Sequence, residues 1–195
     1  MKFLFYFCTV PNSRTMKEIY LAGGCFWGVE HFFSLIDGVV KAEAGYSNGN
    51  TSFCGNPEGE GPSYKEVYTD KTGFAETVKV TYDSDKIGLD SLIRLYFKII
   101  DPLSLNRQGH DEGTRYRTGI FYSMAEDYPV IKAVYDELEK RSGQKFVVEL
   151  CPLESFFKAE EYHQEYLFKN PSGYCHLPLE MFQFARSYKA GDPIE

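Results

Sequence analysis

A cysteine follows two glycines at the point where an extended segment gives way to a helical pattern. In Gly23-Gly24-Cys25 the sulfur is expected near free backbone N–H groups and the positive end of the helix dipole. Such a position lowers the pKa of a thiol, and the glycines allow another molecule to approach it closely. Phe26 and Trp27 add two large rings, which make an apolar seat for a small group. We interpret Cys25 as a reactive thiol; a buried, inert cysteine is the alternative.

The alternation of apolar residues along one strand predicts that a carboxyl group points into the interior. Counting by two from Val78, Val80 and Tyr82 places Glu76 in phase with the apolar face of its strand. Burial would raise the pKa of this carboxyl, so that it keeps its proton near neutral pH and can donate it to a leaving oxygen. The alternative is a frayed strand end that leaves Glu76 in water.

The elements that carry these groups alternate between strand and helix. Strands are predicted over residues 18–22, 39–44, 76–82, 119–122 and 146–150, and helices over 26–37, 89–100, 126–142 and 159–168. The third helix is expected to begin with a capping box, Ser123-x-x-Glu126. A Gly-, Asn- and Pro-rich stretch over 47–63 and a polar segment over 106–117 are predicted to be long loops.

This order indicates an α+β fold: a single two-layer mixed α/β domain with a ferredoxin-like (α/β plait) core and long functional loops. We expect residues 16–177 to form the catalytic domain. Residues 1–15 are then an N-terminal extension of doubtful role, and residues 178–195 a C-terminal tail.

Composition narrows the class of protein. The chain has 195 residues, of which 43% are hydrophobic and 25% charged, as in one ordinary globular domain. Its formal net charge of −7 and lack of a basic run argue against nucleic acid and anionic membrane surfaces as partners. We expect a monomer.

The cysteines indicate reactive thiols in a reducing compartment. There are 5 of them, scattered and without a Cys-x-x-Cys pair: Cys8, Cys25, Cys54, Cys151 and Cys175. An odd number with this spacing fits neither a zinc ribbon nor a closed disulfide framework. A short apolar run over residues 3–10 is a faint sign of export, but no cleavage site follows, so we expect the protein in the cytoplasm.

Four motifs together resemble the A-type peptide methionine sulfoxide reductases. They span about residues 17–177 and occur in the order of that family: Gly24-Cys25-Phe26-Trp27-Gly28-x-Glu30; Tyr64-Lys65-Glu66-Val67 with Thr72-Gly73-Phe74-Ala75-Glu76; Asn106-Arg107-Gln108-Gly109-x-Asp111-x-Gly113-Thr114-x-Tyr116-Arg117; and Tyr162-His163-Gln164-x-Tyr166-Leu167 with Gly173-Tyr174-Cys175.

The resemblance implies an oxidoreductase that reduces methionine-S-sulfoxide, free or in peptides and proteins. Cys25 matches the family nucleophile and Glu76 its proton donor to the sulfoxide oxygen. Tyr64 and Tyr116 match the tyrosines that bind this oxygen, and Asp111 matches a carboxylate of the same site. The arguments from the residues thus agree with the family roles of Cys25 and Glu76.

The resemblance also implies how the cycle is completed. Phe26 and Trp27 match the pocket for the substrate methyl group, and Cys175 matches the resolving cysteine. Cys25 would become a sulfenic acid, form a disulfide with Cys175, and be restored by an external dithiol such as thioredoxin. No metal and no organic cofactor are expected.

Some residues depart from the family pattern. Phe74 stands where a histidine is common, which would make the surroundings of Glu76 drier, and Tyr68 replaces a frequent cysteine. The segment after Cys175 lacks the Cys-containing tail of some members, so two cysteines should suffice for recycling. Cys54 remains an alternative resolving cysteine, whereas Cys8 and Cys151 are interpreted as bystanders.

The residues by themselves leave two other classes of function open. A cysteine hydrolase or acyltransferase would use His163 or His110 to activate Cys25, and an inactive binding module would hold oxidised methionine between the rings of Phe26 and Trp27. Of the histidines, His31 and His163 are expected to be packing or surface residues rather than bases, and His176 is interpreted as merely adjacent to the resolving cysteine.

Overall fold

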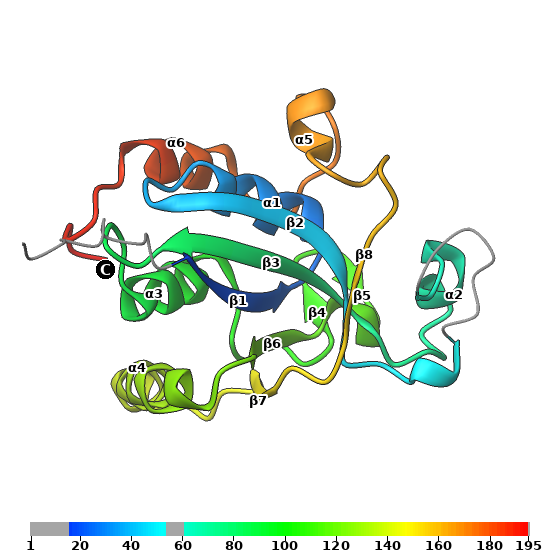
Figure 1. The fold of residues 1–195 in the computed structure, drawn as a ribbon, viewed down its shortest axis with the longest axis horizontal. Helices are drawn as coiled ribbons and strands as arrows, with labels where there is room; N and C mark the ends of the chain where they lie inside the picture. The colour runs from blue at the N-terminus through cyan, green and yellow to red at the C-terminus, as the bar shows by residue number, and fades with distance from the viewer. Residues whose placement is uncertain (1–15, 54–60, 195) are drawn as a thin grey trace, which may run out of the picture.

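The strands predicted from alternation form the centre of one sheet in the computed structural model, which describes residues 16–53 and 61–194 (Figure 1). The strands are β1 (Met16–Gly23), β2 (Val39–Ser47), β3 (Ala75–Asp83), β4 (Arg107–Gln108), β5 (Asp111–Glu112), β6 (Thr118–Tyr122), β7 (Glu149–Pro152) and β8 (Phe156–Lys158). The helices are α1 (Phe26–Ser34), α2 (Tyr64–Tyr68), α3 (Leu89–Ile99), α4 (Tyr128–Ser142), α5 (Tyr166–Lys169) and α6 (Leu179–Ser187), with short 3₁₀ turns η1 (Thr51–Phe53), η2 (Thr114–Tyr116) and η3 (Ala125–Asp127).

The strand order of the large sheet is that of an α/β plait with two added edges. It runs β7-β6-β1-β3-β2-β8, and β3 is antiparallel to both β1 and β2, while β6 is antiparallel to β1. The units β1-α1-β2 and β3-α3-β6 therefore interleave, which confirms the predicted ferredoxin-like core. β4 and β5 form a separate two-stranded hairpin inside the predicted polar loop.

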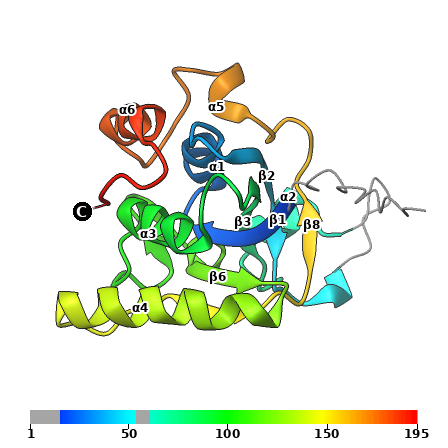
Figure 2. The ribbon, with the colours of Figure 1, turned by 60° about the vertical axis from the view of Figure 1, so that its left-hand side comes forward.

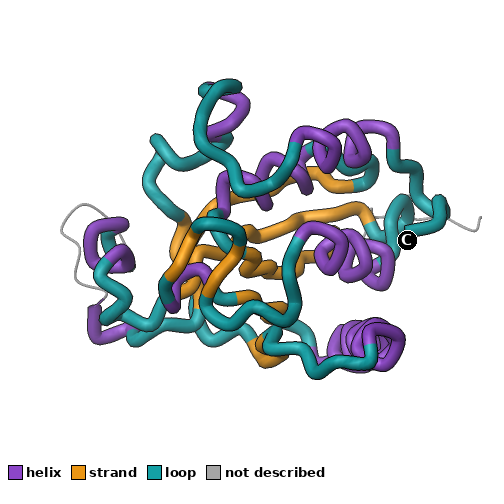
Figure 3. Tube along the Cα trace, turned by 180° about the vertical axis from the view of Figure 1, so that it is seen from behind, coloured by secondary structure: helices purple, strands orange, loops and turns teal. Residues whose placement is uncertain are grey.

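The two faces of the sheet are covered unequally. Along β1, Ile19 and Leu21 point into the main core beneath the helices, whereas Tyr20 and Ala22 belong to a small cluster on the other face. The main core includes apolar residues from α1, α3, α4 and α6, and the views in Figures 2 and 3 show these helices grouped beside the strands. This asymmetry is expected when both crossover helices of a plait pack on one face.

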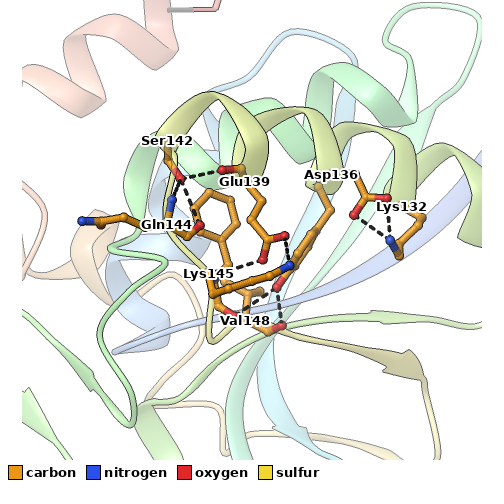
Figure 4. Close-up of polar contacts among 9 residues, drawn as sticks. Lys132, Asp136, Glu139, Ser142, Gln144, Lys145 and Val148 are labelled. Atoms are coloured by element: carbon orange, nitrogen blue, oxygen red, sulfur yellow. Dashed lines mark hydrogen bonds and ion pairs between the residues drawn. The ribbon is translucent and has the colours of Figure 1, made fainter.

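Helix α4 begins later than the sequence predicted. The expected capping box at Ser123 and Glu126 is wrong, because η3 occupies this stretch and α4 starts at Tyr128 without a side-chain cap. Its C-terminus matches the prediction: Gly143 has a left-handed φ of 71° and ends the helix after Ser142. The side chain of Glu139 holds the segment that follows the helix, because it accepts hydrogen bonds from Lys145 Nζ (2.6 Å) and the Phe146 N–H (3.0 Å) (Figure 4).

The C-terminal third differs most from the predicted elements. The strand expected over 146–150 is displaced to Glu149–Pro152, which pairs in parallel with β6. The helix expected over 159–168 is reduced to α5, because residues 161–165 form turns, with Glu165 at a left-handed φ of 51°. The short strand β8 and the helix α6 were not predicted; Phe182 and Ala185 of α6 are buried.

Within residues 16–53 and 61–194, no helix combines the length and apolar character needed to cross a bilayer. The predicted N-terminal extension, Cys8 and the alternative resolving residue Cys54 lie outside the described residues.

Candidate active site

Cys25 is the N-cap residue of α1, at the turn from the strand β1. Gly24 makes this turn possible: its φ is +82°, and a β-carbon there would lie 2.6 Å from Cβ of Gln108. The predicted strand–glycine–helix arrangement around the cysteine is therefore confirmed. Cys25 is only 6% exposed, so a substrate must insert a group to reach its sulfur.

Glu76 lies beside the start of the same helix. It sits opposite Tyr46 in the pairing of β2 with β3, is 1% exposed, and accepts a hydrogen bond from the N–H of Phe26 at 3.0 Å. Burial raises the pKa of Glu76 to about 8, although the Phe26 N–H and the cation of Arg115 act in the opposite direction. The predicted burial of this carboxyl is confirmed, its pKa shifts in the predicted direction, and it is hydrogen-bonded to Phe26, the residue that follows Cys25.

The pKa of Cys25 shifts in the direction opposite to our expectation. Burial raises it well above the ordinary value, and the charges of Glu76, Asp111 and Cys175 add to this effect, whereas only the backbone N–H of Trp27 opposes them. The predicted lowering is wrong because desolvation outweighs the helix terminus, whose Phe26 N–H is already engaged by Glu76. Cys25 therefore rests as a thiol.

Two tyrosines from separate turns complete the polar side of the site. Tyr64 begins α2, which is fixed by a capping box between Ser63 and Glu66 and by a 2.8 Å hydrogen bond from the Tyr64 N–H to Glu160. Tyr116 ends η2. Burial raises the pKa of both phenols, that of Tyr116 to about 12, and the charge of Glu76 adds to the increase in each. Both phenols are therefore proton donors near Glu76.

A buried cation, which the sequence did not single out, holds Tyr116 in place. The guanidinium of Arg115 lies 4.4 Å from the centre of the Tyr116 ring and 4.3 Å from that of Tyr68. Asp70 binds it at 2.6 Å and also accepts the Arg115 backbone N–H at 3.0 Å. The available signal was an arginine within the motif that contains Tyr116.

An aromatic wall faces the polar side. Trp27 stacks on Tyr166 with ring centres 3.7 Å apart, and its Nε1 donates to Nδ1 of His163 at 3.1 Å. Phe26 is fully buried and lies 5.0 Å from the His163 ring. Burial lowers the pKa of His163 to about 4, so it stays neutral, and its packing role is confirmed. Tyr166 was not predicted as part of the site.

The segment that carries this wall is tied to the sheet. The side-chain amide of Gln164 accepts from the N–H of Ala44 (3.1 Å) and donates to its carbonyl (2.9 Å). This pair of bonds replaces the continuous helix that the sequence predicted and places Tyr166 over Trp27.

Cys175 reaches the same site from the C-terminal side. A β-carbon on Gly28 would lie 3.0 Å from its Sγ, so the cysteine packs directly on the first turn of α1. Its sulfur accepts the N–H of Leu177 at 3.3 Å, and burial raises its pKa. Cys151 packs in the small cluster on the other face of the sheet, as expected of a bystander.

These neighbours define the class of the site. The thiols of Cys25 and Cys175, the carboxyl of Glu76 and the phenols of Tyr64 and Tyr116 lie near one another beside Phe26 and Trp27, and the described residues contain no cluster of metal-ligating side chains. A cysteine that is oxidised by a small polar group and then resolved by a second thiol fits this arrangement. The fold and the site are those of a thiol-dependent oxidoreductase.

Comparison with known proteins identifies the family. The model of the peptide methionine sulfoxide reductase family matches residues 17–191. A curated relative, the peptide methionine sulfoxide reductase MsrA of Clostridium acetobutylicum, is 50% identical over 168 residues, which cover 86% of this chain and 99% of the relative. The chain belongs to this family, so it is an oxidoreductase that reduces methionine sulfoxide, and the hydrolase and binding-module alternatives are wrong.

Solved structures support the same assignment of family and fold. Reduced Mxr1 from Saccharomyces cerevisiae has a TM-score of 0.79 and 39% identity, with 84% of this chain and 92% of that chain covered. A structure of Mxr1 in complex with Trx2 has a TM-score of 0.53 and 27% identity, with 77% and 84% covered. The predicted fold class is confirmed.

Proposed function

We propose that this enzyme reduces the S epimer of methionine sulfoxide, free or in peptides and proteins, with Cys25 as nucleophile and Glu76 as proton donor. The observation that carries the proposal is the 3.0 Å hydrogen bond from the Phe26 N–H to Glu76. This bond holds the carboxyl of Glu76, which keeps its proton near neutral pH, beside Phe26, the residue that follows Cys25. An arrangement of this kind can serve a neutral substrate whose oxygen must gain a proton to leave.

In the first step the sulfur of Cys25 attacks the sulfoxide sulfur. Glu76 gives its proton to the sulfoxide oxygen, and the hydroxyls of Tyr64 and Tyr116 stabilise the charge that develops there. The oxygen is transferred to Cys25, which becomes a sulfenic acid, while the sulfoxide gains two electrons and leaves as methionine. Glu76 recovers a proton from the thiol, so the step is balanced.

The aromatic wall explains the choice of epimer. The rings of Phe26 and Trp27 receive the methyl group, and the donors Glu76, Tyr64 and Tyr116 fix the direction of the oxygen. With these two substituents assigned, the lone pair and the remaining carbon chain of only one epimer can be placed correctly. Asp111 would contribute a carboxylate to the same site.

In the second step the thiol of Cys175 attacks the Cys25 sulfenic acid, which forms a disulfide and releases water. An external dithiol then reduces this disulfide and is itself oxidised to a disulfide. We propose thioredoxin for this role, supported by the structure of the relative Mxr1 in complex with Trx2. Because the cycle needs only thiols, we propose that no prosthetic group or metal takes part.

The proposed setting follows from the same chemistry. A thiol cycle requires a reducing compartment, so we place the enzyme in the cytoplasm, as a monomer whose partners are oxidised proteins or peptides and thioredoxin. The net charge of −7 does not favour nucleic acid or an anionic membrane.

The test uses purified protein, excess dithiothreitol and the separated epimers of methionine sulfoxide. The S epimer should be consumed and the R epimer should not, and Cys25→Ser should release no methionine. Cys175→Ser should release one equivalent per enzyme without reductant and should fail to cycle with thioredoxin. Absence of turnover in the parent protein refutes the proposal, and sustained cycling of Cys175→Ser transfers the resolving role to another cysteine such as Cys54.

A further inference from the structure

His176, which follows the second cysteine, is buried within the site rather than simply adjacent to it. Its side chain is 4% exposed. A β-carbon on Gly24 would lie 3.4 Å from its Nε2, and one on Gly28 would lie 3.2 Å from its Cε1 and 3.0 Å from Sγ of Cys175. The imidazole and the thiol of Cys175 therefore pack against the same turn of α1.

Three buried polar atoms without normal hydrogen bonds meet at this ring. Both nitrogens of His176 and Oδ2 of Asp111 lack a partner of normal geometry within the described residues, and Nδ1 of the ring lies 4.0 Å from that oxygen. Buried polar atoms are rarely left without partners, and such groups often mark a function. The pair is one small shift away from a carboxylate–imidazole hydrogen bond.

The carboxylate of Asp111 also reaches the residue on the other side of the cysteine. A hydrogen bond to Asp111 and its charge help burial to raise the pKa of Tyr174. Tyr174 and His176 thus flank Cys175 in sequence and both face one carboxylate of the β4–β5 hairpin. This hairpin therefore holds the segment that carries the thiol.

We propose that His176 relays the proton in the disulfide-forming step, with Asp111 orienting its ring. This inference rests on the proposed function, because it needs a sulfenic acid on Cys25. The neutral imidazole takes the proton of the Cys175 thiol, and the resulting thiolate attacks the sulfur of Cys25. The S–S bond forms as the S–O bond breaks, and the same proton passes from the ring to the departing hydroxide, which leaves as water.

The surrounding charges are compatible with this role. The titratable groups that the structure places near the ring are the carboxyl of Asp111 on β5, 4.0 Å from Nδ1, the thiol of Cys175, which packs on the same turn of α1, and Tyr174, which shares the carboxylate of Asp111. Burial lowers the pKa of His176, while Asp111 and the Gly23 carbonyl act in the opposite direction. The ring is therefore neutral near pH 7 and free to accept a proton, whereas the pKa of Cys175 is raised, so its thiol needs a base.

A single-turnover experiment separates the two steps. Reduced enzyme is mixed with methionine-S-sulfoxide without reductant, quenched at short times, and analysed for released methionine and for the Cys25–Cys175 disulfide by mass spectrometry. In His176→Gln, which keeps an amide beside Asp111 but carries no proton, methionine release should stay within about twofold of the parent. Disulfide formation should slow by roughly 10²-fold at pH 7, as for loss of a general acid–base group.

The pH profile distinguishes proton relay from a structural role. In the parent, disulfide formation should fall as pH drops and the ring becomes protonated; in His176→Gln this limb should vanish, and the deficit should shrink towards pH 10 as Cys175 ionises by itself. His176→Asn should behave in the same way. His110→Gln, at the exposed turn of the hairpin, is the matched control and should change neither step.

Other outcomes contradict either the role of His176 or the proposed function. The inference is overturned if His176→Gln forms the disulfide with the rate and pH profile of the parent. It is also overturned if His176→Gln slows methionine release and disulfide formation equally, because that result indicates a structural role. No methionine release by the parent refutes the proposed function itself. A parent disulfide between Cys25 and another cysteine overturns the role of His176 while leaving the first step intact.

Discussion

Cys25 and Glu76 occupy one buried site, and each makes ionisation of the other harder. Burial is the main cause that raises both pKa values, and the charge of Glu76 further raises that of Cys25. Near neutral pH both groups therefore hold their protons, and in the proposed first step the thiolate forms only when the substrate oxygen takes one of them. This explains how a thiol with a raised pKa can serve as a nucleophile.

The first prediction concerns the proton of Glu76. Because its pKa is raised to about 8, the rate of methionine release should fall as pH increases through that value. Glu76→Gln should lower the rate by about 10²- to 10⁴-fold, the usual contribution of a general acid, and should remove this falling limb. Rapid-quench measurements from pH 6 to 10 check both points. A falling limb that persists in Glu76→Gln would assign it to another group.

Asp70 supports the site without touching the proposed substrate position. It binds the Arg115 guanidinium that lies over Tyr116, and its φ of 58° suits Asp or Asn. Asp70→Asn should therefore keep the backbone but lose the charge of a partly buried pair, which costs on the order of 1–3 kcal/mol of unfolding free energy. It should also lower kcat more than it raises KM, because Tyr116, proposed to stabilise the charge that develops on the sulfoxide oxygen, loses its support. Urea unfolding and steady-state kinetics of Asp70→Asn and its parent measure both effects.

At the scale of elements, α6 is part of the packed structure. Phe182 is buried and meets His31 of α1 edge to face at 4.9 Å, so α6 covers the outer side of the helix that starts at Cys25. The family model also extends to residue 191 and includes α6. Helix α6 therefore contributes to the placement of α1.

Removal of the buried ring of α6 tests this packing. Phe182→Ala should cost roughly 3 kcal/mol of unfolding free energy, in line with large-to-small changes in cores. Leu179→Ala, on the exposed side of the same helix, should change it by less than about 0.5 kcal/mol. Urea unfolding of both variants under reducing conditions measures the difference. Equal effects of the two substitutions would contradict the packing of α6 on α1.

What the sequence predicted well were elements with a long regular pattern. β1, β3 and α3 were predicted because alternation or helical spacing extends over most of each element. The position of Cys25 at a strand–helix turn and the burial of Glu76 were predicted because the glycine pair and the strand phase are local signals. β8 was missed because it has three residues and depends on pairing with β2, which lies over a hundred residues earlier. α5 was overextended because the bonds of Gln164 to Ala44 override local helix preference.

The contacts that the sequence did not predict have a common cause. Asp70 binds Arg115, and Asp111 lies 4.0 Å from His176, and each contact joins segments that are distant in the chain, so no spacing rule can bring them together. The sign of the Cys25 shift was missed for a related reason, because burial of a thiol depends on the whole surrounding structure. Local rules gave the helix terminus but not the desolvation that outweighs it.

At the scale of the whole molecule, two buried carboxyl groups oppose folding at high pH, because each must lose its proton in the interior. The pKa of Glu76 is raised to about 8 and that of Glu30, also buried on α1, to about 7, mainly by burial. Several exposed acids, such as Glu137 and Glu139, have lowered pKa values through their cation partners, but solvent screens those pairs. Glu76 and Glu30 therefore make folding less favourable as pH rises towards 9, whereas the lowered pKa of His163 reduces stability towards pH 5.

The sign follows from linkage. A carboxyl whose folded-state pKa lies above its ordinary value of 4.5 binds its proton more tightly in the folded protein, so its stabilisation is fully present below that value and is lost as pH rises through the folded pKa. The unfolding free energy should therefore decrease from pH 6 to 9. Each unit of pKa difference corresponds to about 1.4 kcal/mol, so Glu76 alone should account for a few kcal/mol.

Glu76→Gln should reverse this loss, because the amide keeps an acceptor for the Phe26 N–H and never ionises. The variant should be more stable than its parent at pH 9 by a few kcal/mol, with a much smaller difference at pH 5. Making both measurements in a Cys25→Ser background removes the contribution of thiol ionisation. A stability difference between the Glu76→Gln variant and its parent that is the same at pH 5, 7 and 9 would contradict a buried, titrating carboxyl. The expected result means that the proposed proton donor, Glu76, is maintained at the cost of folding stability in alkaline solution.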